Sequence, residues 1–170
     1  MADHMIDGGE MRKMRKLVLG CSCIASFLLL FASTDSEATE ISERALLGRT
    51  MWSAFECGAF GESSGQQQEA ERLYSHGIGA GRQFLQAIRA GSPTEEELRQ
   101  STPVGVMLRL GGDSDDFIIG RIFEAALEEA LAKVWYDADD MHRTNPRPET
   151  LRKLEAEASY GSSNCELMGH

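Results

Sequence analysis

The sequence predicts an all-α protein, a compact bundle of four to six helices that is tied by one disulfide and preceded by a signal peptide. Apolar residues recur at spacings of three and four through most of residues 39–170, which is typical of amphipathic helices. A short apolar run near the N-terminus has the flanks of an export signal. Of the four cysteines, only Cys57 and Cys165 follow that run, and in an oxidising compartment such a pair most simply forms a disulfide.

The front of the chain has the layout of a signal peptide. Basic residues at 12–16 precede an apolar run over residues 17–32, and small residues follow it. The run is shorter than the roughly 20 apolar residues that a membrane-spanning helix needs. We therefore expect residues 1–38, an N-terminal extension and signal peptide, to be cleaved after Ala38. Residues 39–170 would then form one helical domain, periplasmic or secreted; the alternative is an inner-membrane anchor through residues 17–32.

The first two helices of that domain follow from periodicity and glycine. Apolar residues spaced three or four positions apart predict a helix over residues 40–60, with Thr39 as its N-cap. Glycines and serines over residues 58–65 mark its end. The second helix has the cleanest apolar face, from residue 70 to residue 88, and Gly91 follows its end as a C-terminal glycine.

Three glycines are expected where helices cross. Gly77 and Gly81 lie four residues apart on the apolar face of the second helix, although each interior glycine costs about 1 kcal/mol relative to alanine. We expect them to permit close approach by a neighbouring helix, and a kink is the alternative. Residues 81–87 share Gly, Arg, Phe and Ala with residues 120–126, so Gly120 is expected at a second crossing.

A short third helix and an apolar run come next. Ser92 is expected as its N-cap, Pro93 in its first turn and Glu95 as the partner of a capping box. Residues 102–103 interrupt this helix. The run over residues 104–110 could be a buried strand or a short buried helix, and we favour a helix because no second strand is present to pair with it.

Two further helices complete the domain. The acidic residues 113–116 are typical of a helix N-terminus, and a long helix is expected from there to about Tyr136. A last helix is expected over residues 149–160, ended by Gly161. The tail then carries Cys165 back toward the first cysteine of the domain.

Two arginines follow the repeated glycines. We expect Arg82 and Arg121 each to reach a carboxylate such as Glu56, Asp116 or Glu124, because a half-buried guanidinium needs an anionic partner. Together these five residues would form a polar network. The alternative is a pair of surface arginines with solvated head groups.

No metal, cofactor or nucleic acid is expected. An EF-hand starting at Asp113 would need glycine where Ile118 stands, and His76 and His142 lack a third zinc ligand at a suitable spacing. No nucleophile or phosphate-binding motif is present, so no catalytic residue is assigned. The net charge is −10, and residues 39–170 contain no cluster of Lys and Arg that would bind phosphate backbones.

Several patches resemble a group of small, exported, all-helical proteobacterial proteins without an assigned function. They are residues 54–57, 81–85, 103–106, 116–122 and 164–165. The resemblance implies a periplasmic location and pairing of Cys57 with Cys165. It carries over no catalytic residue.

The function expected from these features is that of a non-catalytic binding or protein-interaction module, with another envelope protein as its partner. One alternative is an acid- or envelope-stress chaperone, because its many carboxylates would be neutralised at low pH. Another is a small hydrolase or metal-dependent enzyme that uses His76 or His142 with nearby acids. The oligomeric state stays open.

Overall fold

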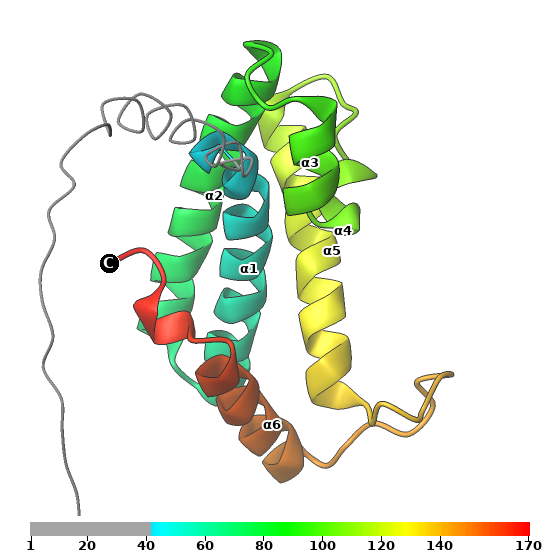
Figure 1. Cartoon of the computed structure of the whole chain (residues 1–170). Helices are drawn as coiled ribbons and strands as arrows, with labels where there is room; N and C mark the ends of the chain where they lie inside the picture. Colours follow the sequence, from blue (N-terminus) through cyan, green and yellow to red (C-terminus); the bar gives the residue numbers. More distant parts are fainter. Residues whose placement is uncertain (1–41) are drawn as a thin grey trace, which may run out of the picture. The chain divides into compact units, whose positions relative to one another are not determined.

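The computed structural model describes residues 42–170, which form six α-helices, one short 3-10 helix and no strand (Figure 1). The helices are α1 (Glu43–Ser64), α2 (Gln67–Arg89), α3 (Glu95–Ser101), α4 (Val104–Met107), α5 (Asp115–Trp135), α6 (Glu149–Ser162) and the 3-10 helix η1 (Cys165–Leu167). The predicted all-α class and the disulfide between Cys57 and Cys165 are confirmed. The predicted signal peptide and the alternative anchor lie outside the described residues.

Helix α1 begins three residues later and ends four residues later than the sequence predicts, and its N-cap is Ser42 and not Thr39. It begins after Ser42, whose hydroxyl accepts a backbone N–H of the first turn, and it ends at Gly65, which has a left-handed φ of +89°. Gly58 and Gly61 therefore lie inside the helix and not in a loop. Both are buried, and a Cβ at Gly58 would collide with the ring of Tyr74, so this glycine permits close packing by α2.

Helix α1 lies between α2 and α5 and packs against both (Figure 1). A Cβ at Gly77 would lie 2.5 Å from the ring of Phe55, and one at Gly81 would lie 2.6 Å from the sulfur of Met51. Both α2 glycines therefore allow α1 to approach closely, as expected. The expected crossing at Gly120 is wrong within this chain: α5 turns that residue to solvent, and a Cβ there would meet no atom of residues 42–170 within 4 Å.

The third helix starts two residues later than predicted. Thr94 is its N-cap: its hydroxyl accepts the N–H of Glu97 at 3.2 Å, and its own N–H donates to the Glu97 carboxylate at 2.7 Å. This reciprocal pair is a capping box. Ser92 also stands three residues before a glutamate, but its hydroxyl instead accepts a hydrogen bond from Arg44 on α1 at 2.6 Å. Of the two candidate caps, Thr94 makes the local capping contacts and Ser92 makes a long-range contact.

The remaining elements agree with most expectations. The apolar run contains the short helix α4, and no strand is present in residues 42–170. Ser114 caps α5 by accepting the N–H of Phe117 at 3.2 Å. Helix α6 does not stop at Gly161 but continues to Ser162. The tail then returns through η1, where Cys165 bonds to α1.

Two groups of buried side chains form the core. One joins α1, α2, α4 and α5, and the other joins α1, α2, α5, α6 and the tail around the disulfide. The larger members of the first group are Met51, Phe55, Phe84, Val106 and Ile122. Helix α1 contributes to both, so it is the central element on which the other helices are placed.

Candidate interaction surface

Large apolar side chains are exposed on α4 and at the start of α5. Val104, Leu108 and Phe117 are 72%, 74% and 55% exposed, and we call them together the α4–α5 surface. Val104 begins α4 and Leu108, its C-cap, lies four residues later on the same side, while Phe117 stands in the first turn of α5, which packs against α4. Contiguous exposed apolar patches are common sites for binding other molecules.

The orientation of α4 explains why two of these residues face solvent. Val106 is fully buried, and the backbone of Gly105 lies so close to the ring of Trp52 that a Cβ there would collide with it. These two contacts turn one side of the short helix into the core. Val104 and Leu108 necessarily point the other way, and the sequence expectation that the whole run is buried is therefore wrong for them.

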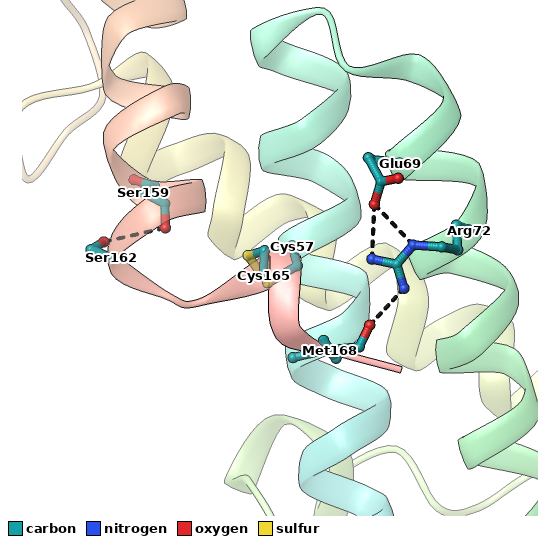
Figure 2. Close-up of a disulfide and its surroundings, with 7 residues drawn as sticks. All are labelled: Cys57, Glu69, Arg72, Ser159, Ser162, Cys165 and Met168. Atoms are coloured by element: carbon teal, nitrogen blue, oxygen red, sulfur yellow. Dashed lines mark hydrogen bonds and ion pairs between the residues drawn. A yellow bond between two sulfur atoms is a disulfide. The ribbon is translucent and has the colours of Figure 1, made fainter. Parts of the chain in front are cut away.

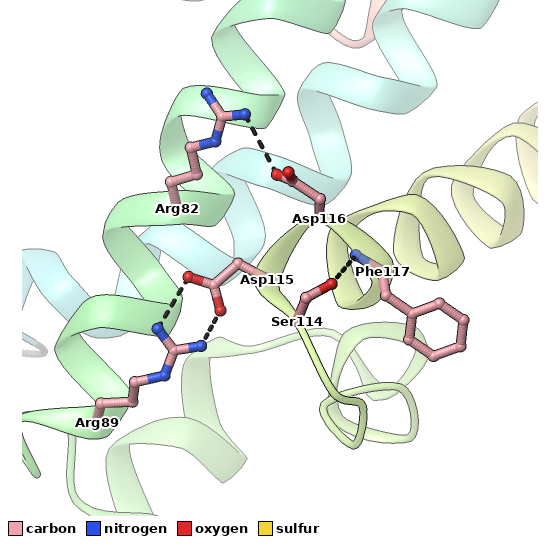
Figure 3. Close-up of polar contacts among 6 residues, drawn as sticks. All are labelled: Arg82, Arg89, Ser114, Asp115, Asp116 and Phe117. Carbon is pink, nitrogen blue, oxygen red and sulfur yellow. Dashed lines mark hydrogen bonds and ion pairs between the residues drawn. The ribbon is translucent and has the colours of Figure 1, made fainter.

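Phe117 is held in place by its own neighbours. Its backbone N–H donates to Ser114, and a Cβ at Gly112 would lie 2.7 Å from its ring, so the ring rests on that glycine. The guanidinium of Arg121 lies 5.7 Å from the ring centroid and donates to the Gly111 carbonyl at 3.0 Å. In Figure 3 the Phe117 side chain points away from α2. Gly112 and Arg121 thus hold the Phe117 side chain in place, although the residue is 55% exposed.

Ion pairs between α2 and α5 hold the N-terminus of α5 beside this surface. Arg89 binds both carboxylate oxygens of Asp115, and Arg82 lies 3.2 Å from Asp116 (Figure 3). The two carboxylates also lie at the positive end of the α5 dipole. All four side chains are partly or largely exposed, so each pair contributes little stability and mainly sets the position of the helix end.

The predicted polar network does not form as one unit. Of its five members, only Arg82 and Asp116 contact one another. Glu56 pairs instead with Lys133 at 2.7 Å. Burial lowers the pKa of Lys133, but hydrogen bonds and charge from Glu56 and Glu129 outweigh it, and the pKa is raised overall.

Two members of the predicted network remain without a carboxylate or cationic partner among residues 42–170. Arg121 supports the Phe117 ring, and Glu124 is exposed on the same helix. Both lie on the solvent-facing side of α5, where α1 and α2 do not reach them. The expectation that each arginine pairs with an acid is therefore wrong for Arg121 within the described part of the chain.

The C-terminal tail is fastened to α1 and α2 (Figure 2). Cys57 and Cys165 are 1% and 0% exposed, so the disulfide lies in the core and out of reach of solvent thiols. Beyond it, Arg72 donates to the Met168 carbonyl at 2.6 Å. A Cβ at Gly169 would lie 2.9 Å from the His76 ring, so this histidine packs against the tail backbone.

His76 and His142 are the residues on which a metal-dependent enzyme would rely, and the alternative membrane anchor, residues 17–32, lies outside the described residues. Within residues 42–170, no group of three His, Cys, Asp or Glu side chains could hold a metal ion. His76 lies against the tail and His142 is exposed in the loop between α5 and α6. Over the same residues, every helix is too short or too polar to span a bilayer.

Sequence reasoning missed all three members of the α4–α5 surface. Val104 and Leu108 were expected in the core because they belong to an apolar run, and the four-residue helix is too short for periodicity to separate its faces. For Phe117 a signal was present. It is the third residue after the N-cap Ser114, and it falls outside the inward stripe that contains Ile119 and Ile122.

Comparison with protein-family models, with curated proteins and with solved structures finds no match to this chain. The function must therefore be inferred from the chain's own residues.

Proposed function

We propose that the protein is an exported, non-catalytic interaction module that binds a protein partner in the cell envelope through the α4–α5 surface. The observation that supports this most directly is the exposure of Val104, Leu108 and Phe117 on backbone that the core holds in place. Export is supported by the signal-like residues 12–38 and by the buried disulfide, which is typical of oxidising compartments.

Burial of apolar side chains would be the main driving force for binding by this surface. Fully burying one Val, Leu or Phe side chain contributes about 1.5–3 kcal/mol, and association costs about 4–15 kcal/mol of lost translational and rotational freedom. The three side chains therefore offset only part of that cost, and the other contacts of the interface must supply the rest. Because Gly105, Gly112 and Arg121 already hold α4 and the Phe117 ring, little additional ordering is required on binding.

The test combines site-specific crosslinking with matched variants. A photoreactive amino acid at position 108 should crosslink an envelope protein when the full protein is expressed in its own cells. Phe117→Asp should abolish the crosslink, because it places a charge in the apolar contact. Leu151→Asp is the matched control: Leu151 is 50% exposed on α6, so its substitution should leave the crosslink intact.

Circular dichroism should show the same helix content for both variants as for the unchanged protein. Two results would contradict the proposal: no crosslinked protein from position 108, or equal crosslinking in both aspartate variants.

A further inference from the structure

We propose that the loop between α5 and α6 is a proteolytic processing site, at which an arginine-specific protease hydrolyses the Arg143–Thr144 bond and leaves two chains joined by the Cys57–Cys165 disulfide. The step consumes one water molecule. Its oxygen stays in the new carboxylate of Arg143, and Thr144 becomes an N-terminal amine. The inference is independent of the interaction function proposed for the α4–α5 surface.

The loop over residues 136–148 offers a protease an open stretch of backbone. It contains no helix, and none of residues 137–148 is buried. Figure 1 shows the loop extending away from the ends of α5 and α6. Proteases bind their substrates in an extended form, so they cut exposed irregular loops in preference to helices. Extending this segment in a protease cleft uncovers no core side chain.

Arg143 is the one basic residue in this part of the fold that a protease could reach. Among residues 42–170, three Lys or Arg residues lie outside the α-helices: Arg109, Arg143 and Arg147. Arg109 is followed by Leu110, which packs against the core. The Arg147 side chain is only 16% exposed, and the next residue is Pro148, which has no N–H and a fixed φ. Arg143 has a side chain that is 51% exposed and no proline after it.

Few contacts oppose the opening of the loop at Arg143. Its guanidinium lies 3.5 Å from the carboxylate of Glu128, and both side chains are more than half exposed, so this pair contributes little stability. Asp140 accepts the N–H of Asn145 at 2.8 Å, also at the surface. The φ of Arg143 is +51°, a left-handed value that residues with a side chain seldom adopt. An extended conformation in the protease relieves that strain.

The disulfide determines what the cut produces. Cys57 precedes the cut bond and Cys165 follows it, so the two chains stay covalently linked. Helix α6 also packs against α1, and its side chains Ala156 and Tyr160 belong to the buried group around the disulfide. Because the disulfide itself is buried, the linked product resists solvent thiols as long as it is folded. The cut protein should therefore keep its helices.

The first experiment measures the intact mass of the full protein recovered from its own cells, with inhibitors of arginine-specific proteases present from lysis onward. Without a reductant, the processed protein should be heavier than the uncut protein by one water. After unfolding and reduction with dithiothreitol, it should separate into a chain that ends at Arg143 and a chain that begins at Thr144. Circular dichroism before reduction should show the helix content of the uncut protein.

The second experiment uses three variants expressed in the same cells. Arg143→Gln should abolish the cut. Glu128→Gln removes the ion pair of Arg143 but keeps the arginine, so the cut should be at least as complete as in the unchanged protein. Lys153→Gln is the matched control, because it removes an exposed cation that lies within α6, and the cut should be unchanged. Purified uncut protein treated with trypsin should also be cut first at the Arg143–Thr144 bond.

Three results would overturn the inference: a single chain after reduction of the protein recovered from its own cells, a first cut at another bond, or a cut that persists in Arg143→Gln. A bond that trypsin cuts in the purified protein but that is intact in the protein from cells is accessible without being a processing site, and this outcome also refutes the proposal. Loss of the helices on cutting, with the disulfide intact, would refute the expected two-chain product.

Discussion

Replacing Gly77 with alanine should destabilise the fold, whereas the same change two residues later, at Gly79, should stabilise it. Both glycines lie inside α2, so both substitutions gain about 1 kcal/mol of helix propensity. The surroundings differ. A Cβ at Gly77 would lie 2.5 Å from the ring of Phe55, and one at Gly79 would meet nothing within 4 Å among residues 42–170.

The cost at Gly77 depends on whether Phe55 can move aside. Phe55 is 0% exposed, and its ring packs edge-on against Phe123 with the centroids 5.1 Å apart. A ring so enclosed cannot yield without shifting α1, and overpacking of this kind costs about 1–3 kcal/mol. After the propensity gain, Gly77→Ala should be up to about 2 kcal/mol less stable than the unchanged protein. Gly79→Ala should be up to about 1 kcal/mol more stable.

Urea unfolding followed by circular dichroism at constant pH, with the disulfide intact, measures both free energies. The two variants share a helix, a type of substitution and the same effect on the unfolded chain, so their difference isolates the contact with Phe55. It should be about 1–3 kcal/mol. If Gly77→Ala were as stable as Gly79→Ala, the close crossing of α1 and α2 at this glycine would be refuted.

Three further predictions concern the disulfide, a half-buried phenol and a helix cap. The double variant Cys57→Ala/Cys165→Ala removes a link between residues 108 positions apart and should lose up to about 4–5 kcal/mol of unfolding free energy in urea; a loss below about 1 kcal/mol would contradict the reasoning. Burial, followed by the hydrogen bond to Glu62 and its charge, raises the pKa of Tyr74 above that in the unfolded chain. The unfolded state then releases this proton first, so stability should fall as the pH rises above about 10, and Tyr74→Phe should reduce that fall in alkaline urea titrations. Thr94→Ala removes the N-cap of α3 and should cost about 1 kcal/mol by thermal unfolding, with an unchanged melting temperature as the contrary result.

Much of the helical pattern could be predicted because its causes are local. The clear apolar face of α2, the glycine after its end and the acidic start of α5 depend only on residues a few positions apart. The cap of α3 shows the limit of such reasoning. Ser92 and Thr94 both precede a glutamate by three residues, yet Thr94 caps the helix while Ser92 contacts Arg44, 48 positions away.

The candidate surface could not be predicted for the same reason. Whether an apolar side chain is covered depends on what other elements place over it, and only tertiary packing decides that. Trp52 contacts Gly105 and so turns Val104 and Leu108 outward. Gly81 and Gly120, alike in sequence context, differ because α1 passes the first and nothing in residues 42–170 passes the second.

The sequence by itself determined the all-α class, the approximate positions of the helices and the two cysteines that could pair. Periodicity, caps and cysteine count require no knowledge of distant neighbours. The tertiary structure alone decided which glycines lie at crossings, which charges meet, and that Val104, Leu108 and Phe117 remain exposed. Burial and pairing are properties of segments that meet in space, and a linear pattern does not specify which segments meet.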